Sequence, residues 1–195
     1  YLECPSCAER VPEHHKFCGL CGKPLQSPDG PNTLGTVATG TTGASTPDGL
    51  VEEGFQLTRE RNWNAAISKY VEALALDPRH VKAHWNLAFA LNRAGKHSEA
   101  EEIATKGLSL PNDEYRHGLL YERSFARSIL KQYEEAIADI EEALALRPQS
   151  TKLLYLRSRI YQFSGDRQRA IDDAMEVLRR DPDHTGAYRV VHGMH

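Results

Sequence analysis

Residues 65–78 read AAISKYVEALALDP, and residues 135–148 read EAIADIEEALALRP. The two stretches share one pattern of small and large apolar positions, and both end in Leu-x-Pro. Apolar residues three and four positions apart share one face of an α-helix, so each stretch predicts an amphipathic helix that stops near its proline. A third copy spans residues 168–182, and a weaker copy spans residues 98–111. The chain from residue 49 onward is therefore predicted to consist of repeated helical units.

The spacing of the copies indicates which helical unit repeats. Pro148 and Pro182 hold the same place in successive copies. Their separation equals the period of the tetratricopeptide helix-turn-helix unit, which is about 34 residues. Residues 47–182 resemble four such repeats, and residues 185–191 resemble the first helix of a further one. The resemblance implies an all-α solenoid of paired helices, in which each unit packs mainly on its neighbours.

Small residues, turn glycines and terminal prolines carry this resemblance. Small side chains let the two helices of a unit cross closely, and Gly95 and Gly165 suit a left-handed turn. The small residues at the expected crossings are Gly54, Ala66, Ala88, Ala100, Ala136 and Ala170. The third unit departs from the family, because Arg123 and Ser124 replace a large apolar residue and a Gly or Ala. Extra residues also precede Tyr115, so we expect irregular packing between the second and third units.

All four cysteines lie near the start of the sequence, as Cys4-x2-Cys7 and Cys18-x2-Cys21. This spacing can bring four thiolates to one tetrahedral zinc ion. Two disulfides are the alternative, which paired Cys-x2-Cys motifs and an intracellular setting disfavour. Residues 1–26 resemble a short zinc ribbon. The resemblance implies one structural Zn²⁺ held by the four cysteines, with no coordination position left for catalysis.

The stretch between the cysteines and the repeats has a different composition. Residues 27–48 are rich in Gly, Thr, Ser and Pro and contain almost no large apolar residue. Such a stretch buries too little surface to offset the entropy of ordering it. We therefore predict three parts: a zinc ribbon over 1–26, a flexible linker over 27–48, and about four repeats with a further helix over 49–195.

The first helix of each repeat is expected to line the concave wall of the solenoid, and residues four apart on it share a face. This register predicts a mostly aromatic surface that binds a partner segment. Packing between neighbouring helices is an equally good interpretation for the Trp and the two Tyr residues of this set. The predicted partner-binding residues are Phe55, Trp85, Phe89, Tyr121, Phe125, Tyr155 and Arg159.

Four cations, Arg59, Lys82, Arg93 and Arg159, are expected to flank this surface and to select acidic residues in a partner. Tetratricopeptide proteins that hold the tails of Hsp70 and Hsp90 use a basic clamp on the same wall. Only Asn86 matches that clamp here, so binding of Hsp70 or Hsp90 tails is disfavoured. The expected partner is a protein or peptide segment with apolar anchors. The residues in place of the other clamp positions are Val51, Phe55, Gly118 and Glu122.

Composition limits the remaining function classes. The chain carries 24 basic and 27 acidic side chains, a net charge of −3, so no general field attracts nucleic acid or an anionic membrane. No apolar run approaches the ~18 residues of a membrane span. We find no nucleophile with a partnering base and no Gly-rich phosphate loop. The sequence predicts a cytoplasmic scaffold or adaptor that is not an enzyme. Two alternatives stay open: a nucleic-acid-associated factor that uses the zinc ribbon, and the regulatory part of a longer enzyme.

Overall fold

The structure is a computed structural model that describes residues 2–3, 10–11, 46–111 and 113–193. The chain divides into two compact units, residues 1–43 and residues 44–195. In the first unit, β1 (Leu2–Glu3) pairs antiparallel with β2 (Arg10–Val11). The four cysteines of the predicted zinc ribbon and the predicted linker up to residue 45 lie outside the described residues.

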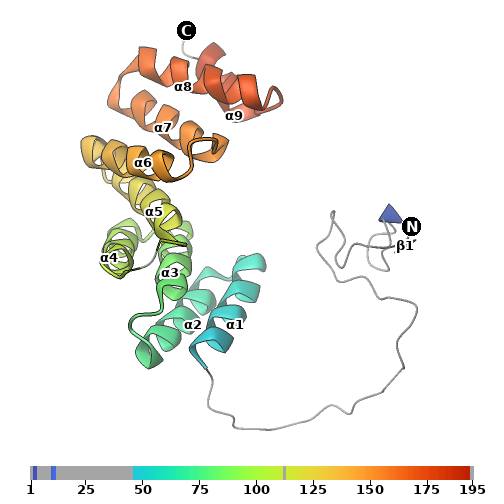
Figure 1. Cartoon of the computed structure of the whole chain (residues 1–195), viewed down its shortest axis with the longest axis vertical. Helices are drawn as coiled ribbons and strands as arrows, with labels where there is room; N and C mark the ends of the chain where they lie inside the picture. Colours follow the sequence, from blue (N-terminus) through green and yellow to red (C-terminus); the bar gives the residue numbers. More distant parts are fainter. Residues whose placement is uncertain (1, 4–9, 12–45, 112, 194–195) are drawn as a thin grey trace. The chain divides into compact units, whose positions relative to one another are not determined.

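The described part of the second unit consists of nine α-helices that follow one another along its length (Figure 1). Four helix pairs are followed by one further helix, which confirms the predicted all-α fold. The pairs are α1 (Pro47–Arg59) with α2 (Trp63–Leu76), α3 (Val81–Arg93) with α4 (His97–Leu108), α5 (Arg116–Ile129) with α6 (Tyr133–Leu146), and α7 (Thr151–Ser164) with α8 (Arg167–Arg180). The further helix is α9 (Thr185–His192), and none of the described helices is long and apolar enough to cross a membrane.

Side chains and turn residues set where the helices begin and end. Thr46 caps α1, because its Oγ1 accepts a hydrogen bond from the Gly49 N–H at 3.1 Å. The turn inside each of the four units contains one residue with positive φ, and two of these are the predicted glycines, Gly95 and Gly165. The other two turns place Arg61 (φ 60°) and Lys131 (φ 64°) in the left-handed region, which costs energy for a residue with a Cβ.

The two helices of the first unit cross at the expected small residues. A Cβ added to Gly54 would lie 2.5 Å from Cε1 of Tyr70, so only glycine fits against this fully buried ring. Thr58 donates its hydroxyl proton to the Gly54 carbonyl at 2.9 Å, and its Oγ1 lies 3.0 Å from the Tyr70 hydroxyl. Tyr70 must therefore be the donor to Thr58. This pair satisfies a phenol that would otherwise be costly to bury.

The third unit replaces apolar contacts at its crossing with polar ones. Ser124 donates its hydroxyl proton to the Ala136 carbonyl at 2.8 Å. Arg123 binds both carboxylate oxygens of Asp139, at 2.9 Å from Nε and 2.6 Å from Nη2. Arg127 adds a third hydrogen bond to Asp139, at 2.9 Å. The departure from the family pattern is therefore compensated, because a hydrogen-bonded carboxylate stands where an apolar contact is usual.

The fourth unit repeats the same polar arrangement. Ser158 donates to the Ala170 carbonyl at 2.8 Å, and Arg157 binds both oxygens of Asp173 at 2.7 Å each. The serine, the arginine before it and the aspartate sixteen positions after that arginine thus form one recurring device. It fastens the two helices of a unit together in both the third and the fourth repeat.

Contacts between neighbouring units show which side of the stack is concave. The first helices contact one another in succession, α1 with α3, α3 with α5, α5 with α7 and α7 with α9. Among the described helices, no second helix contacts the second helix of the next unit. A stack whose first helices lie closer together curves toward them, so α1, α3, α5 and α7 line the concave face.

Candidate functional site

Three of the predicted partner-binding aromatics pack between successive first helices and form the floor of the concave face. The Trp85 ring lies 5.6 Å from the Tyr115 ring, and a Cβ added to Gly118 would lie 2.7 Å from Trp85 Nε1. Tyr155 packs its hydroxyl end against Gly186 in the same way. These side chains fill the joints between units, where a small residue on the next helix leaves room for a large ring.

Tyr121 holds the corresponding place between α5 and α7. Desolvation by burial raises the pKa of its phenol to about 12, so the ring stays neutral at physiological pH. The ammonium group of Lys152 lies 3.9 Å from the centroid of this ring, within range of a cation–π interaction. The floor of the concave face therefore positions a cation as well as filling a joint.

The three predicted phenylalanines differ in accessibility. Phe55 is 44% exposed and Phe89 and Phe125 are half-buried, as residues that present an apolar surface should be. Phe163 is 48% exposed on α7, and Ile129 is 45% exposed on α5. Sequence reasoning missed these last two residues. They continue the same four-residue spacing, since Phe163 follows Tyr155 and Arg159, and Ile129 follows Tyr121 and Phe125.

Two arginines stack on the phenylalanine rings. The guanidinium carbon of Arg93 lies 5.1 Å from the Phe89 centroid and 5.7 Å from the Phe125 centroid. The guanidinium carbon of Arg159 lies 4.8 Å from the Phe163 centroid. We call these five residues the concave row: Phe89, Arg93, Phe125, Arg159 and Phe163. Rings and cations alternate along it, so the row offers apolar area and positive charge to the same ligand.

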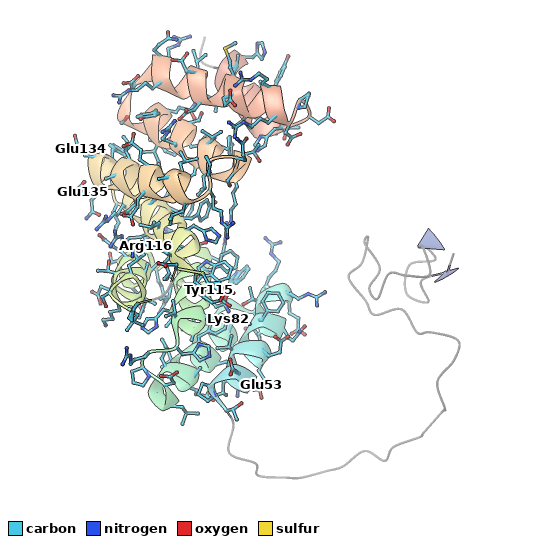
Figure 2. All side chains as sticks on the ribbon, viewed as in Figure 1. Glu53, Lys82, Tyr115, Arg116, Glu134 and Glu135 are labelled. Atoms are coloured by element: carbon cyan, nitrogen blue, oxygen red, sulfur yellow. The ribbon has the colours of Figure 1, made fainter. Side chains whose placement is uncertain are left out.

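The cations of the concave face differ in their pairing from the partly buried arginines on the opposite faces of α5 and α7. Arg123, Arg127 and Arg157 each form an ion pair with a carboxylate of a second helix. No ion pair with a described residue is formed by any of the five concave cations, which are Arg59, Lys82, Arg93, Lys152 and Arg159. Figure 2 shows Lys82 on one side of the stack and the acidic pair Glu134 and Glu135 on the other. The concave face therefore carries cations that no ion pair with a described residue neutralises, although the whole chain is slightly negative.

A pocket opens at one end of the row, between α5 and α7. Its volume is about 290 Å³, and we call it the α5–α7 pocket. It brings together four of the predicted partner-binding residues, whereas Phe55, Trp85 and Phe89 lie outside it. The residues that shape it most are Tyr121, Phe125, Ile129, Tyr155, Arg159 and Phe163.

A buried polar network links α3, α4 and α5 next to the row. Asn92 donates through its side-chain amide to both the backbone carbonyl and Oε2 of Glu122, at 2.9 and 3.0 Å. His97 Nδ1 lies 3.2 Å from Asn92 Oδ1, and the His97 ring lies 6.0 Å from the Phe125 ring. Glu122 is only 2% exposed, and desolvation raises the pKa of its carboxyl. Burial raises this pKa although the Asn92 hydrogen bond acts in the opposite direction, and the network holds three helices in register.

The positions that correspond to the chaperone-tail clamp are unsuited to a carboxylate. Val51 and Glu122 are buried, and Gly118 has no side chain to offer and abuts Trp85. A buried Glu122 stands where the clamp has a cation. The structure thus supplies the physical reason why a tail carboxylate would find no partner at these places.

Other features of the described residues do not form an alternative site. A cavity of about 530 Å³ lies among α2, α3 and α4 and is lined mainly by apolar side chains such as Val71, Leu74 and Ile103. In the part of the chain that the structure describes, no cluster of three or more His, Cys, Asp or Glu side chains could hold a metal ion. The concave row and its pocket are therefore the candidate functional site.

Comparison with protein families and known proteins identifies tetratricopeptide repeats in this chain. Two family models, both described as tetratricopeptide repeat, match residues 57–120, and residues 117–150 and 151–184. The chain is 26% identical over 148 residues to sperm-associated antigen 1 from Homo sapiens. The match covers 71% of this chain but only 16% of that protein.

Two solved structures have similar folds. The crystal structure of MamA has a TM-score of 0.63 and 22% identity, covering 71% of this chain and 80% of that one. The second tetratricopeptide domain of human RPAP3, solved in complex with the HSP70 peptide SGPTIEEVD, has a TM-score of 0.54 and 26% identity. That match covers 58% of this chain and 97% of the RPAP3 domain.

Proposed function

Because the chain belongs to the tetratricopeptide repeat family, whose members mediate protein–protein interactions, we propose that it is a scaffold whose concave row binds an acidic partner segment with apolar anchors. The single observation that carries this proposal is the set of five concave cations without a carboxylate partner among the described residues. By contrast, Arg123, Arg127 and Arg157 of α5 and α7 are neutralised within the fold.

Charge and apolar area favour the same class of ligand. Arg93 and Arg159 are already held in place by stacking on rings, so a partner carboxylate meets a guanidinium that loses little further freedom on binding. Phe55 and Phe163 are exposed and supply apolar contact area. A bound partner would remove this area from water, which stabilises the complex. Positive charge on the wall speeds encounter with an acidic segment and disfavours basic ones. A partner segment that combines Asp or Glu with large apolar residues satisfies both features.

The peptide held by the RPAP3 domain contains both acidic and apolar residues, which supports a peptide as the kind of ligand. The chemistry of the present wall points to a different mode of binding. Its cations lie over phenylalanine rings, and three of the clamp positions hold a buried side chain (Val51, Glu122) or a glycine (Gly118). The proposal therefore places side-chain carboxylates and apolar anchors, rather than a chaperone tail, along the row.

Selection from a random peptide library displayed on phage tests this function, with the full chain as bait. We expect the enriched peptides to carry Asp or Glu within a few positions of a large apolar residue, and to bind less tightly as salt rises. Their affinity, measured by fluorescence polarisation, should fall for Phe89→Gln and Arg93→Gln. Met175→Gln is the control, because Met175 is an exposed apolar residue of α8, a second helix outside the concave row. Peptides without acidic residues, or equal binding to row and control variants, would refute the proposal.

We also propose that Cys4, Cys7, Cys18 and Cys21 hold one structural Zn²⁺ in an accessory docking module. Two Cys-x2-Cys pairs are a donor set suited to tetrahedral zinc, and a module of this size has little apolar core to fold without a metal. The four thiolates would hold the ion and leave no open position for a reacting water. Native mass spectrometry with and without chelator measures the stoichiometry. One zinc per chain, lost on chelation while the helical circular dichroism signal persists, is the expected result, and a metal-free chain with two disulfides would contradict it.

A further inference from the structure

The α5–α7 pocket makes the proposed ligand more specific. Resting on the proposed function, we infer that this pocket takes one large apolar side chain, aromatic or leucine-like, of a partner segment while a carboxylate next to that side chain binds Arg159. The pocket is thus an anchor site for an apolar residue with an acidic neighbour. Its occupant is a protein segment of that composition, rather than a purely apolar helix or a second copy of this chain.

The size of the pocket matches a single side chain. A cavity of ~150 Å³ holds a benzene molecule, so about 290 Å³ accommodates a phenyl ring or a leucine side chain together with the adjoining backbone. Whole small-molecule ligands usually occupy larger clefts, of roughly 300–1,000 Å³. The volume therefore favours an anchor that enters from a longer segment lying along the concave row.

The walls of the pocket offer apolar surface that nothing in the described fold covers. Ile129 and Phe163 both line it, from the last turns of α5 and α7, and both are close to half exposed. Phe125 and the packed Tyr121 form its floor side. Because the two exposed residues come from neighbouring helices, one inserted side chain can contact both and remove their apolar area from water.

Arg159 gives the pocket its charge preference. Its Nε is buried without a hydrogen-bond acceptor, while Nη1 donates to the Tyr155 hydroxyl at 3.3 Å. The guanidinium thus makes only one long hydrogen bond and no ion pair with a described residue, so it keeps donor capacity for a carboxylate on a ligand. None of the residues that line the pocket is acidic. A carboxylate on the ligand is therefore the group that is missing.

The same helix shows what an arginine does when its carboxylate is present. Arg157, two residues earlier on α7, binds both oxygens of Asp173 at 2.7 Å. Arg159 projects from the other face of the helix and has a phenylalanine ring and a tyrosine hydroxyl around it instead. Planar, bidentate recognition of a carboxylate is the contact that a guanidinium makes best. From this contrast, Arg157 stabilises the fold, whereas the guanidinium of Arg159 is available to bind a carboxylate of a ligand.

Two small probes separate the apolar and the charged parts of this inference. Hydrocinnamate carries a phenyl ring joined to a carboxylate by a short aliphatic link, so it represents an aromatic side chain with an adjacent carboxylate. Hydrocinnamamide is its neutral isostere. Both are titrated into the full chain and followed by NMR, using the Ile129 methyl signals as the local reporter. We expect both probes to shift these signals and hydrocinnamate to bind about fivefold more tightly, because a charge-assisted hydrogen bond is stronger than a neutral one.

Variants assign the preference to individual side chains. Arg159→Gln should bring the two probes to equal affinity, and Phe163→Ala should weaken both. Arg79→Gln is the matched control, because Arg79 is an exposed arginine in the turn between α2 and α3, has no ion pair with a described residue and lies outside the concave cations. It should leave both affinities unchanged. Equal binding of the two probes to the unchanged chain, a preference that survives Arg159→Gln, or no shift at Ile129 would each overturn the inference.

The outcome can be told apart from failure of the proposed function. If the probes fail at the pocket but displayed acidic peptides still bind and are lost with Phe89→Gln, the concave row is a binding surface and only the anchor assignment is wrong. If neither the probes nor the peptides bind, both proposals are wrong. Circular dichroism of each variant checks that it keeps the helical content of the unchanged chain.

Discussion

Replacing Asp139 with alanine removes the carboxylate that joins two arginines of α5 to α6. Asp139 is buried, with its side chain 5% exposed, and it accepts hydrogen bonds from Arg123 at 2.6 and 2.9 Å and from Arg127 at 2.9 Å. In Asp139→Ala, both guanidiniums would remain largely buried, since their side chains are only 16% and 19% exposed. The variant therefore leaves charge in the interior without its counter-charge.

The expected loss of stability follows from this burial. Breaking a buried ion pair by removing one partner costs about 3–5 kcal/mol. Arg127 keeps its second partner, Glu101, at 2.8 Å, so the lower end of that range applies. A loss of about 3 kcal/mol corresponds to a decrease of about 6–12 °C in Tm for a domain of roughly 150 residues.

Chemical denaturation of the full chain, followed by circular dichroism, measures this loss. Asp172→Ala is the matched control, because Asp172 is an exposed aspartate of α8 that accepts a hydrogen bond only from Gln168, and it should change stability by less than about 0.5 kcal/mol. The difference between the two variants should persist in high salt, because buried pairs are screened less than exposed ones. If Asp139→Ala were no less stable than Asp172→Ala, the reasoning would be refuted.

Two further substitutions and one chemical treatment test other parts of the structure. Burial raises the pKa of Glu122, so the stability that this carboxyl contributes is complete below its ordinary pKa and is lost as pH rises through the raised value. Glu122→Gln should therefore flatten the pH dependence of the free energy of unfolding above the ordinary pKa of a glutamate. At neutral pH this variant should be more stable than the unchanged chain. A variant with the same pH profile as the unchanged chain would contradict the prediction. Gly118→Ala should destabilise the chain by about 1–3 kcal/mol and shift tryptophan fluorescence, because its Cβ would lie 2.7 Å from Trp85 Nε1; a stable variant with unshifted emission would show that the ring can move aside. Chelation should release zinc without changing the thermal unfolding of the helices, and a lower Tm would show that the metal supports the solenoid.

The helical repeat could be predicted from residues close together in the chain. Each helix carries its own apolar stripe, and Pro78, Pro148 and Pro182 mark corresponding helix ends, so the repeat is visible without any knowledge of distant contacts. The four-residue spacing along the first helices also predicted which side chains share the concave face. Extending that spacing by one more step would have found Ile129 and Phe163, because the face continues to the last turn of each helix.

Tertiary structure alone decided which side chains of that face are accessible. Trp85 and Phe89 are four residues apart on one helix, yet Trp85 fills a joint because Gly118 on the next first helix leaves space for it. Arg157 and Arg159 are two residues apart, yet only Arg157 meets a carboxylate, since Asp173 lies on the other side of α7. Pairing, burial and the α5–α7 pocket depend on residues from separate helices, whose relative positions are set by the packing of units against one another. The local pattern of the chain thus determines the helices and their faces, and the contacts between helices determine which side chains stay free to bind a partner.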